Sequence, residues 1–223
     1  MKLVLFSDYK YVNTQEVGTR LIELIGKNQP TVGYISSCPD STKKFYHETK
    51  EYYSKFDAIL SPYVDLEDGF NSDNIELIFQ ADAIHLSGGN TYRFLYWIVE
   101  RNLCKRLIEY VNSGGVLIGV SAGSIIMTPN ISECVMCGDE NYIGLRNTKG
   151  LGLVNFRYIP HAIKGNILSK DIITKSKQDN SAIVVSSDYD WIVIDGVKSE
   201  IYGEPKLILN GEIVDIASLN SFV

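Results

Sequence analysis

The segment GVSAG at 119–123 places a serine where an apolar stretch, 116–120, gives way to a helix-like one. In this strand–turn–helix context the pattern G-x-S-x-G is typical of a nucleophile elbow, a tight turn that lifts a serine hydroxyl above the carboxyl edge of a sheet. The glycines are required because a side chain there would clash with neighbouring strands. The N-terminus of the next helix would direct N–H groups at the site, where they stabilise negative charge. We therefore predict Ser121 as a nucleophile.

A nucleophilic serine requires a base, and the chain holds three histidines. His161 follows a strand-like run that Pro160 ends, and the carboxyl end of a strand is where an open α/β sheet places its active residues. We predict His161 as the base. His47 lies in a polar, aromatic helix and is predicted to be a surface residue. His85 lies inside an apolar strand, where a core position is expected, and it is kept as a candidate for substrate binding.

The carboxylate that would orient the base is left open by the residues alone. Between Ser121 and His161 the acidic residues are Glu133, Asp139 and Glu140, all within a polar and irregular stretch. Residue type does not separate Asp139 from Glu140. Glu140 is also a candidate for contact with the substrate.

A second glycine-rich turn, SGGNT at 87–91, follows the predicted strand 81–86. Glycine lets backbone N–H groups approach a ligand closely. The turn lacks the lysine of a P-loop and the spacing of G-x-G-x-x-G, so a phosphate site is not favoured. We expect it to complete an oxyanion hole, with the N–H of Gly89 beside that of Ala122. Gly88 and Asn90 are further candidates for substrate contact, and Asn90 is also suited to cap the next helix.

An alternation of strands and helices is expected to position these residues. Short apolar runs predict strands at 2–6, 31–36, 57–66, 81–86 and 116–120. Helical spacing or composition predicts helices at 14–25, 41–56, 71–80, 91–110 (in one or two pieces) and about 165–176. Short apolar strands between helices indicate a parallel sheet covered on both faces. Short strands with tight turns from 182 onward indicate a small antiparallel edge. The prediction is a three-layer, doubly wound α/β fold forming a single domain, 1–223.

Composition and charge narrow the class of protein. The 223 residues are 45% hydrophobic and 22% charged, as in globular proteins, with a net charge of −6 and no basic patch. We therefore expect neither a nucleic-acid partner nor an anionic membrane. The start of the chain lacks the pattern of a signal peptide, and a cytoplasmic protein is expected. The lone C-x-x-C at 134–137 lacks the second ligand pair of a zinc site, and no metal or cofactor is predicted.

Three stretches together resemble the peptidase E family, the aspartyl dipeptidases and their relatives, whose fold is similar to class I glutamine amidotransferases. They are LSGGNTYRFL (86–95), GGVLIGVSAGSIIM (114–127) and GLGLVNFRYIPHA (150–162). The resemblance implies Ser121 as nucleophile, His161 as base and the Gly88-Gly89 loop as part of the oxyanion hole. The family's acid lies roughly two dozen residues before the histidine, which implies Asp139 here, with Glu140 as its rival.

The activity implied is hydrolysis of small peptides by a metal-free serine peptidase, a monomer or homodimer, through an acyl-enzyme. Aspartyl dipeptidases carry an arginine after the histidine that pairs with the substrate's aspartate. Here that stretch holds Lys164, Lys170 and Lys175 and no arginine, and lysine is not a bidentate carboxylate clamp. The preferred side chain is therefore open. Alternatives are another serine hydrolase, such as an esterase or a cyanophycinase-like amide hydrolase, and a non-catalytic small-molecule binding protein on the same scaffold.

Overall fold

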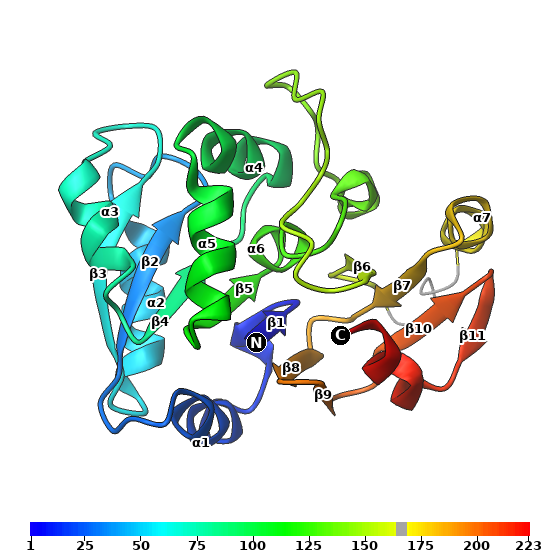
Figure 1. Cartoon of the computed structure of the whole chain (residues 1–223), viewed down its shortest axis with the longest axis horizontal. Coiled ribbons are helices and arrows are strands. Elements are labelled where there is room, and N and C mark those ends of the chain that lie inside the picture. Colours follow the sequence, from blue (N-terminus) through cyan, green and yellow to red (C-terminus); the bar gives the residue numbers. More distant parts are fainter. Residues whose placement is uncertain (164–168) are drawn as a thin grey trace.

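The computed structural model describes residues 1–163 and 169–223. Its largest element is a seven-stranded sheet with the order β3-β2-β4-β5-β1-β8-β9 (Figure 1). The parallel strands are β1 (Lys2–Phe6), β2 (Thr31–Ser36), β3 (Ile59–Asp65), β4 (Ala83–Leu86) and β5 (Val116–Val120). Two antiparallel strands, β8 (Trp191–Asp195) and β9 (Lys198–Tyr202), extend the sheet beyond β1. The predicted mostly parallel sheet is confirmed.

Helices cover both faces of this sheet. Side chains alternate between the two faces along each buried strand, so apolar residues point to both sides and both sides are covered. On β1, Leu3 and Leu5 face one core, and Val4 and Phe6 face the other. The first core lies under α3 (Ser72–Ile78), α4 (Thr91–Glu100) and α5 (Leu103–Asn112). The second core lies under α1 (Thr14–Ile25) and α2 (Lys44–Ser54). The three-layer arrangement therefore agrees with the prediction.

Asparagine residues begin several of these helices. The side chains of Asn13, Asn71 and Asn90 accept hydrogen bonds from the first backbone N–H groups of α1, α3 and α4. These caps satisfy donors that have no partner within the helix. The helical stretch predicted at 91–110 is divided into α4 and α5 at Asn102, which has a left-handed φ of 56°.

The C-terminal region differs from the predicted simple edge. Four strands form a second sheet of order β11-β10-β7-β6. They are β6 (Phe156–Ile159), β7 (Ala182–Val185), β10 (Lys206–Leu209) and β11 (Glu212–Val214). Strands β6 and β7 are parallel, and the other pairs are antiparallel. Only β8 and β9 form the antiparallel edge of the main sheet.

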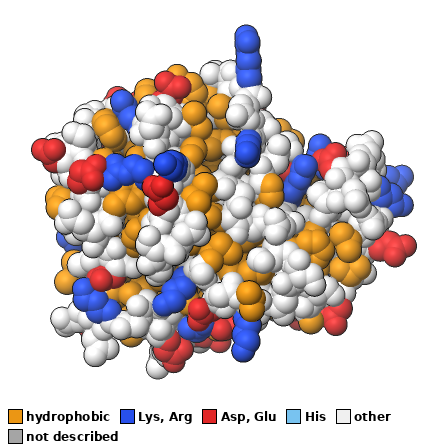
Figure 2. Space-filling view, viewed as in Figure 1, with side chains coloured by type: hydrophobic (Ala, Val, Ile, Leu, Met, Phe, Trp, Pro, Cys, Tyr) orange, Lys and Arg blue, Asp and Glu red, His pale blue; other side chains and the backbone are white. Residues whose placement is uncertain are grey.

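One helix, α7 (Lys170–Asp179), packs on the second sheet. The helix predicted at about 165–176 falls partly on 164–168, which lie outside the described residues, as does Lys164. Short 3-10 turns occupy Tyr9–Tyr11, Ser132–Cys137 and Ile216–Phe222. On the face in Figure 2, basic side chains lie among acidic ones and do not gather into one patch. Within the described ranges, the helices lack the length and hydropathy that crossing a membrane would require.

Candidate active site

Ser121 lies in a sharp turn between β5 and the short helix α6 (Ala122–Ile125). Its backbone has φ 50° and ψ −110°, a conformation that L-residues rarely adopt. The turn is held at both ends: the Ser121 N–H donates to Phe6 O at 3.0 Å, and its carbonyl accepts from the N–H of Ile125 at 3.0 Å. The side chain therefore stands at the carboxyl edge of the central parallel strands.

The two glycines of this turn are required by close packing. A Cβ on Gly123 would lie 2.2 Å from the carbonyl oxygen of Leu86 on β4, and one on Gly119 would lie 2.6 Å from the backbone of Gly123. Ser124, the next residue, is buried and donates its hydroxyl to Phe6 O at 2.8 Å. The serine at this position is thus accommodated without an unpaired hydroxyl.

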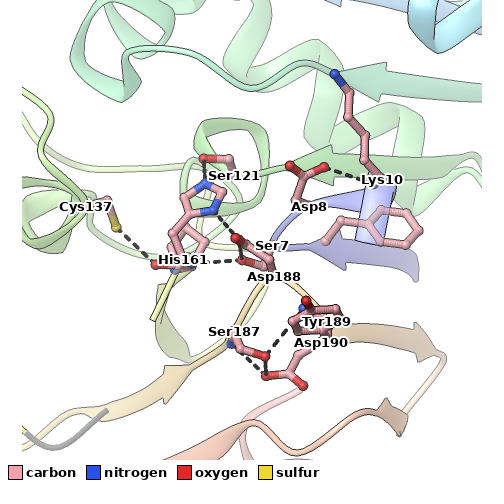
Figure 3. Close-up of polar contacts among 12 residues, drawn as sticks. Ser7, Asp8, Lys10, Ser121, Cys137, His161, Ser187, Asp188, Tyr189 and Asp190 are labelled. Carbon is pink, nitrogen blue, oxygen red and sulfur yellow. Dashed lines mark hydrogen bonds and ion pairs between the residues drawn. The ribbon is translucent and has the colours of Figure 1, made fainter. Parts of the chain in front are cut away.

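Ser121, His161 and Asp188 form a continuous line of hydrogen bonds (Figure 3). The Nε2 atom of His161 lies 2.7 Å from Ser121 Oγ, and its Nδ1 atom lies 2.5 Å from Asp188 Oδ1. The side chains of His161 and Asp188 are each 37% exposed, so the site is open to small molecules. This arrangement can transfer a proton from the serine to the imidazole while the carboxylate holds the other ring nitrogen.

The third member of this line corrects the sequence prediction. Asp139 does not contact His161; its Oδ2 accepts from the N–H of Thr91 at 2.9 Å, at the start of α4. A carboxylate is favoured there because it meets the positive end of the helix dipole. Glu140 is exposed, and its backbone carbonyl accepts from Asn90 Nδ2 at 2.9 Å. The carboxylate that meets the imidazole is Asp188.

The pairing of β6 with β7 explains the position of Asp188. These strands are parallel, with Ile159 opposite Val185, so the chain leaves both at the same edge. The ladder continues through the N–H of Ala162, which donates to Ser186 O at 2.9 Å. His161 and Asp188 therefore come side by side. The sequence signal for this residue is an aspartate just past a predicted strand, and it is ambiguous because an antiparallel edge strand would place that aspartate away from His161, whereas the parallel β6–β7 pair places it beside the imidazole.

Ser7, which the sequence analysis did not identify, connects the two sheets at this point. Its Oγ accepts from the backbone N–H of His161 at 2.8 Å and donates to Asp188 Oδ1 at 3.3 Å (Figure 3). The loop that carries Asp188 is held by the buried Asp190, whose Oδ2 accepts from the N–H and hydroxyl of Ser187 at 2.7 and 2.9 Å. The backbone of His161 and the loop that carries Asp188 are thus both held in place.

The Gly88-Gly89 turn lies directly against the serine. A Cβ on Gly88 would come within 3.6 Å of Ser121 Cβ. The Gly88 carbonyl accepts from Ser37 Oγ at 2.5 Å, and because the two groups of a trans peptide point in opposite directions, the N–H of Gly89 points away from Ser37. Gly89 has φ 140°, which favours glycine. The N–H of Ala122, as the first of α6, has no acceptor within its own helix.

A cavity of about 280 Å³ opens beside Ser121 and His161. Gly88, Gly89 and His85, which are among the predicted site residues, line it. Asn90 and Glu140, which were also candidates for substrate contact, do not line it. Asn90 instead caps α4, with its Oδ1 accepting from the N–H of Arg93 at 2.9 Å.

Cys134 and Cys137, the two cysteines of the C-x-x-C, are buried and half-buried respectively. In the described ranges, no group of three or more His, Cys, Asp or Glu residues is placed to hold a metal ion. Burial raises the pKa of Cys134 and Cys137 to about 12, so both thiols stay protonated at neutral pH. A thiol rather than a thiolate is a poor ligand and a poor nucleophile.

The fold and this site define an α/β protein with a serine-hydrolase arrangement of side chains at the carboxyl edge of its sheet. The chain belongs to peptidase family S51, whose family model matches residues 3–201. The resemblance to peptidase E is confirmed by relatives that carry that name. A peptidase E of Nostoc sp. is 30% identical over 113 residues, covering 51% of this chain and 46% of the relative.

An uncharacterized peptidase of Listeria monocytogenes is 32% identical over 119 residues, covering 52% of this chain and 57% of the relative. The chain thus spans about half the length of the curated relatives it matches. A solved structure of a Listeria monocytogenes protein assigned to peptidase E superposes with a TM-score of 0.73 at 24% identity, covering 91% of this chain and 98% of that one. A peptidase from an acI-B1 actinobacterium superposes with a TM-score of 0.69 at 19% identity, covering 96% of each chain. These structures support the fold.

Proposed function

We propose that this chain is a serine peptidase that hydrolyses small peptides through an acyl-enzyme on Ser121. The observation that carries the proposal is the hydrogen-bonded line from Ser121 Oγ through His161 to Asp188, in a chain of a peptidase family. The family supports peptide hydrolysis, and the geometry supports the assignment of roles to individual residues.

In the proposed reaction, His161 Nε2 takes the proton of Ser121 as Oγ attacks the scissile carbonyl. Asp188 accepts from the Nδ1–H of His161, which selects the tautomer with a free Nε2 and stabilises the imidazolium that forms. The N–H groups of Gly89 and Ala122 stabilise the oxyanion of the tetrahedral intermediate. The imidazolium protonates the leaving amine, and a water molecule, activated by the same histidine, then hydrolyses the acyl-enzyme.

The cavity supports a small substrate. At about 280 Å³ it is just smaller than the range for ligand pockets, roughly 300–1,000 Å³. A space of this size accepts one side chain with its adjoining backbone. We therefore propose dipeptides or tripeptides as substrates, without a metal or other cofactor taking part.

The test is hydrolysis of a panel of dipeptides, aminoacyl p-nitroanilides and simple esters by the wild-type chain, Ser121→Ala and the control Ser113→Ala. Ser113 is an exposed serine at the end of α5, so its variant should behave as wild type. A fluorophosphonate probe should label wild type and Ser113→Ala and leave Ser121→Ala unlabelled. Hydrolysis of esters alone would indicate another serine hydrolase. No turnover and no labelling that depend on Ser121 would refute the proposal and favour a binding protein.

A further inference from the structure

The part of the cavity farther from the serine has aromatic walls. Tyr34 of β2 stacks on Tyr63 of β3, with ring centroids 5.8 Å apart and planes at 16°, and on His85 of β4 at 5.1 Å and 10°. Tyr46 of α2 packs edge-on against Tyr34 and Tyr63 at 5.4 and 5.1 Å. All four rings line the cavity, and we call Tyr34, Tyr46, Tyr63 and His85 the aromatic wall. Tyr46 and Tyr63 are half-buried, so their rings are the part of the wall that a ligand can reach, whereas Tyr34 and His85 are buried behind them.

The histidine of this wall carries no charge at neutral pH. His85 is 2% exposed, and burial lowers the pKa of its imidazole to about 3. Its Nδ1 lies 3.1 Å from the hydroxyl of Tyr53, which is also buried. Within the described residues that hydroxyl has no other hydrogen-bond acceptor, so its proton is donated to Nδ1 and the ring proton of His85 is on Nε2. The imidazole therefore acts as a neutral ring and cannot attract a carboxylate by charge.

The charged groups that line the cavity disfavour an acidic side chain. Among the described residues they include the carboxylates Asp8 and Asp40. The ammonium group of Lys10 is paired with Glu48, with 2.6 Å between Nζ and Oε2. No described lining residue is an arginine. The ammonium group of Lys43 lies over the Tyr63 ring, 4.7 Å from its centre, but Lys43 does not line the cavity. An aspartate side chain would thus lose hydration beside carboxylates of the same sign without meeting an unpaired cation among the described lining residues, which is unfavourable.

We propose, resting on the proposed peptidase function, that the aromatic wall is the specificity pocket for the residue whose carbonyl Ser121 attacks, and that it selects phenylalanine or tyrosine against aspartate. The cavity volume of about 280 Å³ is sufficient, since an apolar cavity of about 150 Å³ already binds benzene. A guest ring can pack against the half-buried rings of Tyr46 and Tyr63 in the stacked or edge-on geometries that aromatic pairs favour, while the buried Tyr34 holds Tyr63 in place by stacking on it.

The first experiment compares kcat/KM for the dipeptides Phe-Leu, Tyr-Leu, Ala-Leu and Asp-Leu, which differ only in the residue that would acylate Ser121. We expect Phe-Leu and Tyr-Leu to exceed Asp-Leu by about 100-fold or more, the discrimination that a side-chain pocket can supply. Hydrolysis of Asp-Leu as fast as Phe-Leu, with dependence on Ser121, would overturn the pocket and leave the peptidase proposal intact.

Substitutions at Tyr63 test whether the aromatic wall determines the selectivity. Tyr63→Ala should lower kcat/KM for Phe-Leu by about tenfold, mainly through KM, and change Ala-Leu less than twofold, because only the ring of the substrate loses its contact. Tyr63→Phe should restore the Phe-Leu rate. Tyr142→Ala is the matched control, since Tyr142 is 64% exposed and does not line the cavity. Equal losses for Phe-Leu and Ala-Leu in Tyr63→Ala would contradict the assignment.

A binding measurement reads the pocket independently of turnover. In Ser121→Ala, titration calorimetry should detect L-phenylalaninamide and give at least tenfold weaker binding of L-aspartic acid α-amide. If Ser121→Ala binds the aromatic amide but the wild-type chain hydrolyses none of the peptides, the peptidase proposal is refuted and the cavity is supported as a site for aromatic side chains. Preference for the acidic amide would refute the pocket whatever the activity.

Discussion

Replacing Asp188 by asparagine tests which carboxylate orients His161. The change keeps the size of the side chain and removes its charge. An asparagine that turns its NH₂ group toward Nδ1 forces the imidazole proton onto Nε2, where it blocks transfer from Ser121. One that turns its oxygen toward Nδ1 preserves the tautomer but not the stabilisation of the imidazolium. Both outcomes lower the rate of acylation.

The expected loss follows from the geometry of the pair. The 2.5 Å separation of His161 Nδ1 and Asp188 Oδ1 is that of a short, charge-assisted hydrogen bond. The equivalent change in a serine protease, an example already established for that class, lowers kcat by about 10⁴-fold. Because His161 and Asp188 are each 37% exposed, solvent screens part of the charge, and we expect about 10³-fold here, or roughly 4 kcal/mol in the activation free energy.

The assay is kcat for the best peptide substrate, with Asp139→Asn as the matched control. That variant retains a side-chain oxygen for the N–H of Thr91 and loses only the interaction of a charge with the end of α4, so kcat should stay within about threefold of wild type. KM should change little in both variants. A loss of about 10³-fold in Asp139→Asn, with Asp188→Asn close to wild type, would refute the assignment.

Two further predictions concern the surroundings of the site. Ser7→Ala removes the acceptor of the His161 N–H and a donor to Asp188. We expect kcat to fall about tenfold with KM unchanged, because a base misplaced by a fraction of an ångström stabilises the transition state less well. An unchanged kcat would show that Ser7 is dispensable. The second prediction concerns His85, whose imidazole has a pKa near 6.5 in the unfolded chain and about 3 in the folded one. Between these pH values the unfolded state binds more protons, so the free energy of unfolding decreases as the pH falls, by about 1.4 kcal/mol per pH unit. Urea unfolding should therefore show that the loss of unfolding free energy from pH 7 to pH 5 is about 2 kcal/mol smaller in His85→Gln than in wild type. Equal losses in the two proteins would contradict a neutral, buried imidazole.

Features that depend on one contiguous segment could be predicted from the sequence. The strands β1, β2 and β5 begin and end where expected, because a strand buried on both faces is a nearly continuous apolar run. The turn at Ser121 is encoded by glycines that close packing against Leu86 requires. His161 was identified because Pro160 marks the end of a strand, a signal within two residues of the histidine.

Features that depend on which strands pair were decided by the tertiary structure. Strands β6 and β7 are short apolar runs, and neither run indicates that the two are parallel neighbours in a separate sheet. That pairing brings Asp188 to His161. Ser7 likewise contacts His161 and Asp188 only once β1 has paired with β8, where the Ser7 N–H donates to Asp190 O at 3.4 Å.

The aromatic wall has the same origin. Its rings come from three strands and a helix and are spread from position 34 to 85, and each alone is typical of an ordinary core residue. Backbone pairing places β2 beside β3 and β4, so Tyr34 stacks on rings from both neighbours. Local propensity and close packing depend on neighbouring residues and can be predicted from one segment. The cavity and the hydrogen-bonded line of Ser121, His161 and Asp188 depend on long-range contacts, which exist only once the sheets have formed.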